Sequence, residues 1–166
     1  MALSKTHRHR LDVQGFACVD DRTLAQTHQW LRMSPALCGT IAAAGIALAS
    51  PSILWALAVF AALGAILPFH PFDLIYNLGV RRLTGAPKLP ANGAPRRFAC
   101  GIGSVWLIGT GALFFAGLDI AGYVVGAALI ATAALVATTH FCIPSTVYGV
   151  VFGTPRADVS ERPVRD

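Results

Sequence analysis

The chain has 166 residues, of which 55% are hydrophobic and 13% are charged, and its formal net charge is +5. A soluble domain has about 25% charged residues, so this composition argues against a water-soluble protein and favours one that is solvated by lipid. The basic residues lie beside apolar stretches, which favours membrane lipids as partners and argues against nucleic acid.

The distribution of charge along the chain predicts where the membrane lies. All 13 lysine and arginine residues fall in three segments: 1–33, 70–97 and 154–166. The two stretches between these segments hold a single formally charged side chain, that of Asp119. A charge at mid-bilayer costs about 2.5–3.5 kcal/mol, so insertion into a membrane selects for such exclusion. We therefore expect both neutral stretches to be embedded in a bilayer.

The first segment, 1–33, is expected to be a basic cytoplasmic region that carries a short interfacial helix. Trp30 and Arg32 near its end suit the headgroup layer. His7 and His9 are candidate metal ligands, and a basic tail on the membrane surface is the simpler interpretation of the same run of residues.

Each neutral stretch is too long for one spanning helix of roughly 20 residues and has a break near its middle. The breaks are at Ser50-Pro51-Ser52 and at Ala116-Gly117-Leu118-Asp119. The sequence therefore predicts an all-α, integral membrane four-helix bundle made of two helical hairpins, with helices at about 34–49, 52–69, 98–115 and 120–141. We do not interpret the first helix as a cleaved signal peptide, because the polar segment before it is too long.

The two tight turns carry no lysine or arginine, so the positive-inside rule predicts the orientation. Both termini and the loop 70–97 are expected in the cytoplasm, beside a transmembrane domain at 34–153 in a bacterial inner membrane. The loop is expected to be anchored to the membrane by apolar side chains such as Phe72 and Tyr76. The arginines expected at the lipid headgroups are Arg32, Arg81, Arg82, Arg96 and Arg97.

Small residues mark the expected packing faces, because they let helix backbones approach closely. They are Gly39, Ala43, Gly109, Gly111, Gly122 and Gly126. Packing within the bundle explains these residues, and docking onto another membrane subunit is the alternative.

Several reactive side chains fall at the predicted cytoplasmic ends of the helices. They are Cys38, His70, Cys100, His140 and Cys142. Thiols and imidazoles at one depth indicate a thiol-redox site or a soft metal site, and His70 with His140 would be the pair for a haem. Packing of cysteine as a small buried residue is the alternative. Because the sequence has no nucleotide-binding, hydrolase or zinc-protease motif, we expect no catalytic residue, resident metal or cofactor.

Three motifs lie where predicted helices begin or end. They are His70-Pro-Phe-Asp-Leu-Ile-Tyr-Asn77, Pro95-Arg-Arg-Phe98 and His140-Phe-Cys-Ile-Pro-Ser-Thr-Val-Tyr148. With these motifs, and over about residues 19–151, the chain resembles the bacterial membrane family catalogued as domain of unknown function 4395. The resemblance implies a small four-helix membrane protein with cytoplasmic ends and no established activity. Relatives often carry Cys-x-x-Cys after the last helix, where this chain has Cys142 at the first position and Ser145 at the second.

Two functional hypotheses follow. The favoured one is a non-catalytic accessory subunit that docks onto a larger respiratory or photosynthetic membrane complex through its apolar helix faces. The other is a membrane thiol-redox or sulfur-handling protein centred on Cys142, with Cys38 or Cys100 in place of the missing local partner.

Overall fold

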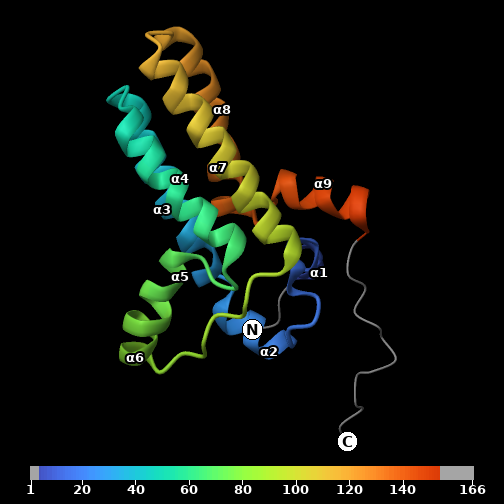
Figure 1. Ribbon diagram of the computed structural model, residues 1–166. Helices are drawn as coiled ribbons and strands as arrows, with labels where there is room; N and C mark the ends of the chain where they lie inside the picture. The colour runs from blue at the N-terminus through green and yellow to red at the C-terminus, as the bar shows by residue number, and fades with distance from the viewer. Residues whose placement is uncertain (1–3, 154–166) are drawn as a thin grey trace, which may run out of the picture.

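The computed structural model describes residues 4–153, and within that range every regular element is helical, which confirms the all-α class. The predicted cytoplasmic tail 154–166 lies outside the described residues. Four long helices form an elongated column, and shorter helices gather at its base (Figure 1). The long helices are α3 (Met33–Ala47), α4 (Pro51–Ile66), α7 (Ala94–Phe115) and α8 (Asp119–Thr139).

The four long helices pack against one another in two hairpins, α3–α4 and α7–α8. Helix α4 lies along α7, and α3 lies along α8. Their shared core consists of aliphatic and aromatic side chains that include Ile46, Leu54, Leu107 and Phe114. Since each helix buries only one stripe in this core, most of the apolar side chains on the column remain on its outside.

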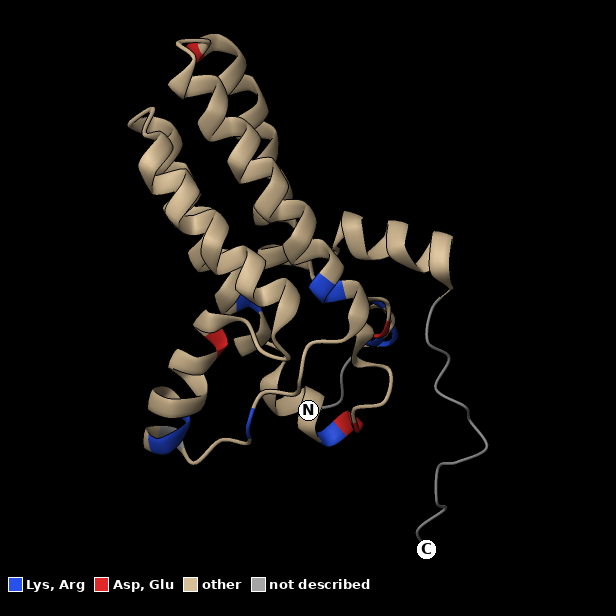
Figure 2. Cartoon of the chain, in the orientation of Figure 1, with Lys and Arg blue, Asp and Glu red and all other residues tan. Residues whose placement is uncertain are grey.

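In each hairpin one tight turn joins the two helices at the tip of the column. In the first turn Ala49 has a left-handed φ of 43°, and Pro51 starts α4 with a fixed φ at a position that needs no amide donor. In the second turn Gly117 has a φ of 72°, and Asp119 lies in the first turn of α8, where the helix dipole favours a carboxylate. Asp119 is also the one acidic residue within 33–66 and 94–139, the residues of the two hairpins, and Figure 2 shows acidic colouring at this tip.

By length and composition, α7 and α8 are the described helices that could each cross a membrane. Helix α4 would be a third only if it is counted with the helical segment after it, from which it is bent by 80°. Helix α3, with 15 residues, is about 22 Å long, which is shorter than the hydrocarbon core of roughly 30 Å.

The base of the column contains a second hydrophobic core, which the sequence analysis did not anticipate. Its buried side chains are Leu11, Phe16, Leu24, Leu31, Tyr76 and Leu89. They come from segments far apart in the chain: α1 (Lys5–Leu11), η1 (Asp12–Phe16), α2 (Asp21–Thr27), η2 (Trp30–Arg32), η3 (Tyr76–Val80) and the strand-free linker before α7. The described part of segment 1–33 is therefore a folded cap on the bundle, which corrects the expectation of a basic tail with one interfacial helix.

Gly15 and Gly93 bring two parts of this base into backbone contact. A Cβ atom built on Gly15 would lie 2.8 Å from the Cα atom of Gly93, and Gly15 also has a φ of 97°. Only glycine satisfies both conditions, so this contact joins η1 to the start of α7.

Two helical segments leave the column at its base. The first comprises α5 (Pro71–Ile75), η3 and α6 (Arg81–Thr84), so the predicted loop 70–97 is helical in its first half. The second is α9 (Ile143–Phe152), which projects sideways (Figure 1). The helix predicted at 120–141 ends at Thr139, because His140 adopts a left-handed conformation with φ of 58°.

Candidate functional site

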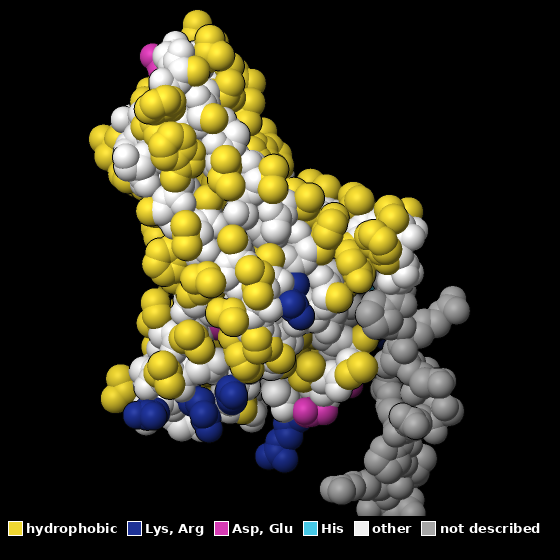
Figure 3. Space-filling model, viewed as in Figure 1, with side chains coloured by type: hydrophobic (Ala, Val, Ile, Leu, Met, Phe, Trp, Pro, Cys, Tyr) yellow, Lys and Arg dark blue, Asp and Glu magenta, His cyan; other side chains and the backbone are white. Residues whose placement is uncertain are grey.

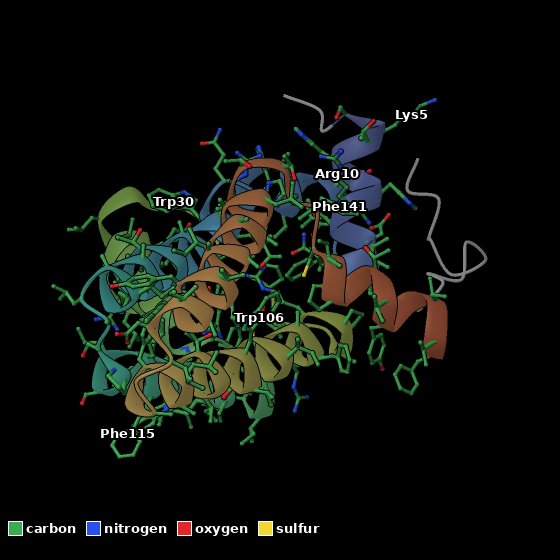
Figure 4. All side chains as sticks on the ribbon, turned by 90° about the horizontal axis from the view of Figure 1, so that it is seen from above. Lys5, Arg10, Trp30, Trp106, Phe115 and Phe141 are labelled. Atoms are coloured by element: carbon green, nitrogen blue, oxygen red, sulfur yellow. The ribbon has the colours of Figure 1, made fainter. Side chains whose placement is uncertain are left out.

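A cavity of about 170 Å³ lies between the four long helices and extends to their basal ends, where Ser34, His70 and Arg96 line it. Its apolar walls come from Ala42, Leu57, Ala61, Leu107, Leu129, Ala133 and Val136. Its polar and sulfur-bearing lining consists of Gln14, Ser34, Cys38, His70, Arg96, Cys100, Thr132 and Cys142. Trp106 also lines it, and viewed from above this side chain lies near the middle of the column (Figure 4).

His70 lies at the basal end of the cavity and precedes α5 as its capping residue. Its Nδ1 atom accepts a hydrogen bond from the Phe72 backbone N–H at 3.2 Å, so this nitrogen carries no proton. The proton of the neutral ring is therefore on Nε2, which lies 3.8 Å from Cys38 Sγ and donates to it. Burial lowers the pKa of His70 to about 4, which keeps the ring neutral at pH 7.

Cys100 reaches the same point from α7, and Gly64 of α4 makes room for both side chains. A Cβ atom on Gly64 would collide with the His70 ring and would lie 3.3 Å from Cys100 Sγ. Sequence reasoning did not single out Gly64. Its position one turn from the end of α4, facing a histidine and a cysteine, is visible only in three dimensions.

Cys142 immediately precedes α9, and its buried side chain lines the cavity. Ser145, three residues after Cys142, is fully buried and donates from Oγ to the Pro95 carbonyl at 3.2 Å. This hydrogen bond holds the start of α9 against the start of α7. The thiols that share a cavity with Cys142 are those of Cys38 and Cys100, and all three are free.

Arg96 is the cationic group of the cavity. Its side chain is only 7% exposed, which corrects the expectation that it reaches lipid headgroups. It donates from an Nη atom to the Leu31 carbonyl at 3.0 Å, and its guanidinium lies 5.4 Å from the centroid of the Phe16 ring. Within residues 4–153 it has no carboxylate close enough for an ion pair.

Asp73 lies close behind this end of the cavity, and sequence reasoning gave it no role. Its carboxylate accepts from the Ser34 hydroxyl, from the His70 backbone N–H at 3.1 Å and from the Asn92 side-chain amide at 3.4 Å. These three donors hold α3, α5 and the linker before α7 together. The carboxylate is absent from the cavity lining, so we assign it to positioning of His70.

His140 points away from the cavity. Its Nε2 atom accepts from Arg32 Nε at 2.8 Å, and its ring lies within about 6 Å of the rings of His7 and His28. Burial, with the nearby Arg32 charge, lowers the pKa of His140 to about 3. His70 and His140 therefore do not face one another, which argues against a haem between them. Within the described part of the chain, no group of three or more His, Cys, Asp or Glu residues is placed to hold a metal ion.

The end of α8 beside His140 is fixed by the basal cap. Arg10 donates to the Thr139 carbonyl at 2.7 Å, and its guanidinium lies 6.0 Å from the centroid of the Phe141 ring; Figure 4 shows the two side chains together. Gln14 donates to the His140 carbonyl. These contacts satisfy carbonyl groups that a helix end leaves without partners.

The other predicted arginines differ in their surroundings. Arg97 donates to the Ala65 and Ile66 carbonyls, at 2.9 and 2.7 Å, and so caps the end of α4. Arg81 and Arg82 are exposed at the base, where Figure 2 shows the basic residues of the described chain.

The predicted small residues fall into two groups. A Cβ atom would contact Ala133 at Gly39 (3.2 Å), Trp55 at Gly111 (2.5 Å), Phe114 at Gly122 (2.6 Å) and Ile46 at Gly126 (2.8 Å). Ala43 is half-buried on α3. Gly109 is exposed, and a Cβ atom there would have no neighbour within 4 Å among the described residues.

Comparison with known proteins identified one family. The model of the family described as Domain of unknown function (DUF4395) matches residues 28–152, a range that includes all four long helices, the cavity thiols and α9. No curated protein and no solved structure matches the chain.

Proposed function

The chain belongs to the DUF4395 family, and from that premise we propose that it is an integral membrane protein whose four long helices hold a thiol-lined cavity for a small sulfur-containing or thiol-reactive molecule. The observation that carries the proposal is the convergence of Cys38, Cys100 and Cys142, from three separate elements, on one cavity. This is the thiol hypothesis of the sequence analysis, with the cavity in place of a local cysteine pair.

The outer surface of the column supports insertion into a membrane. Apolar side chains cover it, and the lysines and arginines lie at the base (Figure 3). The exposed side chains include Val59, Ile66, Val105, Ile120 and Val124. A surface of this kind is costly in water and favourable in lipid. Four crossings, with the base in the bacterial cytoplasm, satisfy the positive-inside rule.

The short helices α3 and α4 do not exclude four crossings. A hydrophobic helix shorter than the bilayer core is accommodated by local thinning of the bilayer or by anchors at its ends, at a modest energetic cost. Each of these helices continues at its basal end into a helical segment, η2 before α3 and α5 after α4.

The cavity suits a small molecule that is not cationic. Cys38 and His70 are in contact, and Cys100 lies beside the same imidazole ring. Because the cavity lies between helices and is mostly apolar, the thiols are reached through a low-dielectric space, which excludes bulky and cationic reagents. Arg96 adds to the exclusion of cations.

Selective labelling tests this proposal. Methyl methanethiosulfonate is small and uncharged; it transfers its methylthio group to a cysteine sulfur and releases methanesulfinic acid. We expect it to label Cys38, Cys100 and Cys142 in membranes, as read by peptide mass spectrometry. Its cationic analogue, trimethylammonioethyl methanethiosulfonate, should label only Cys18, which is exposed at the base, and only after the cytoplasmic side is opened.

A pair of glycine variants provides the control. Gly103 lines the cavity, and a Cβ atom there has no neighbour within 4 Å among the described residues, so Gly103→Met should fill the cavity and slow labelling at least about tenfold. Gly109→Met adds the same side chain on the outside and should leave the labelling rate of the cavity thiols unchanged. Equal labelling of both variants, or labelling of the cavity thiols by the cationic reagent, would contradict the proposal.

The accessory-subunit hypothesis remains a second candidate, and Gly109 favours it. An exposed glycine in the middle of α7, with open space beside it, lets a helix of another subunit approach closely. The wild-type protein should then migrate with a large complex in native electrophoresis of mildly solubilised membranes, and Gly109→Met should release it. Migration of the wild-type protein as a monomer would count against docking.

A further inference from the structure

The cavity has a cationic end and an apolar end. We propose that it binds an anion that carries an apolar chain, with the anionic group at Arg96 and the chain between α3, α4, α7 and α8. The proposal deepens the proposed function by naming the class of molecule that enters, and it depends on the cavity but not on reaction of the thiols.

Arg96 is the first argument. A guanidinium is always charged and has five N–H donors, and one hydrogen bond, to the Leu31 carbonyl, is present within the described residues. The contact with the Phe16 ring stabilises the cation but supplies no negative charge. A charge that is more than nine-tenths buried and lacks an ionic partner is costly, so an anion that enters the cavity gains a charge-assisted contact.

Asp73, the carboxylate behind this end of the cavity, is already engaged by other donors. Asp73 accepts hydrogen bonds on both oxygens, from Ser34, His70 and Asn92, and it is not part of the cavity lining. His70 has its pKa lowered by burial and stays neutral at pH 7. Arg96 is therefore the one formally charged group among the described residues that line the cavity.

The walls specify the remainder of the ligand. Arg96 and Cys38 lie within about two turns of the basal ends of α7 and α3, whereas Leu107 and Leu129 lie near mid-helix. Polarity thus decreases from the base toward the middle of the column. The volume of about 170 Å³ is below the roughly 300 Å³ at which drug-sized pockets begin, which suits one short chain.

Trp106 provides a reporter at the apolar end. In a chain with Trp30→Phe and Trp55→Phe, reconstituted in phosphatidylcholine nanodiscs at pH 7, ω-bromo-octanoate should quench Trp106 fluorescence saturably. The uncharged ω-bromo-octanol should bind at least about tenfold more weakly. A chain that keeps only Trp55, which is 37% exposed and does not line the cavity, corrects for partition of either probe into lipid.

Variants of Arg96 decide the outcome. Arg96→Gln should raise the Kd of ω-bromo-octanoate about tenfold and leave that of ω-bromo-octanol within about twofold, which also shows that the cavity is intact. Arg96→Lys should retain most of the preference for the anion. Equal binding of the two probes to the wild type, or an unchanged preference in Arg96→Gln, would overturn the proposal.

Two further comparisons identify the source of the anion and test the anion site separately from the thiol proposal. If phosphatidylglycerol in the nanodisc displaces ω-bromo-octanoate, the anion is a bilayer lipid; if it does not, the anion is a free single-chain acid. Both results support the anion site. Because fluorescence quenching involves no thiol, failure of cysteine labelling with normal quenching rejects the thiol proposal alone, and the reverse result rejects the anion site alone.

Discussion

Replacing Gly111 by valine is expected to lower the free energy of unfolding by about 1–3 kcal/mol, the usual cost of forcing extra atoms into a packed core. A Cβ atom at this position would lie 2.5 Å from Trp55 Nε1 and 2.9 Å from Trp55 Cδ1. The indole cannot move freely, because its Nε1 donates to the Ile108 carbonyl at 3.3 Å and its ring packs against Phe115. The α4–α7 contact, the most extensive between helices, should therefore open.

Gly109 is the matched control on the same helix. Gly109→Val introduces the same side chain where no atom of the described residues lies within 4 Å of the new Cβ, so the free energy of unfolding should change by less than about 0.5 kcal/mol. Unfolding of both variants in one detergent, followed by helical circular dichroism, makes the comparison. If Gly109→Val and Gly111→Val lose stability equally, the packing of Trp55 against Gly111 does not explain the loss.

These two glycines show what spacing alone can predict. Both were expected on packing faces. Residues two positions apart on an α-helix point about 200° apart around its axis, so Gly109 and Gly111 cannot face the same neighbour. Helical periodicity therefore separates them. It does not show which of the two faces the core, because the sequence around them is apolar on both sides.

The long helices and their turns were predictable because their signals are local. Exclusion of charge from two neutral stretches, with Pro51 and Gly117 as breaks, is visible in the sequence itself. The family assignment was predictable for the same reason, and the match over residues 28–152 confirms it. Both signals lie in contiguous residues.

The basal cap was not predictable from such local signals. Leu11 and Phe16 are buried against Tyr76 and Leu89, which are sixty or more positions away in the sequence. The segment also carries many basic residues, which made it resemble a solvated tail. Arg8 instead donates to the Ala17 and Val19 carbonyls, and so helps to fold the cap.

The different surroundings of Arg96 and Arg97 also could not be predicted from the sequence. Adjacent residues on a helix point about 100° apart, so Arg96 enters the cavity while Arg97 caps α4. The helix expected to start at residue 98 begins at Ala94, which places both arginines within it. Five side chains were expected at one depth: Cys38, His70, Cys100, His140 and Cys142. The direction in which His140 points could not be predicted, because it depends on the left-handed backbone of that residue.

Acidification from pH 7 to pH 4 is expected to destabilise the base of the protein. The pKa of His70 is lowered to about 4 and that of His140 to about 3, first by burial, whereas an unfolded histidine titrates near 6.5. The unfolded state then binds more protons than the folded state, so stability is complete above about pH 6.5 and is lost as the pH falls toward 4. Each histidine contributes on the order of 1–3 kcal/mol to this loss.

The hydrogen bonds of the two histidines also predict that protonation lowers stability. A protonated His70 cannot accept from the Phe72 N–H at Nδ1, and a protonated His140 cannot accept from Arg32 at Nε2. Around His140, the charge of Arg32 and the nearby side chains of His28 and His7 disfavour the protonated ring. Around His70, Asp73 favours the charged ring and opposes the effect in part.

Two substitutions remove the titrating groups and keep the acceptors. His70→Asn retains a good capping residue before α5, and His140→Gln retains an oxygen that can accept from Arg32. Thermal unfolding of the wild type should shift to lower temperature between pH 7 and pH 4, and the double variant should lose most of that shift. If both proteins respond to pH alike, the loss arises from the carboxylates of the cap and not from these two imidazoles.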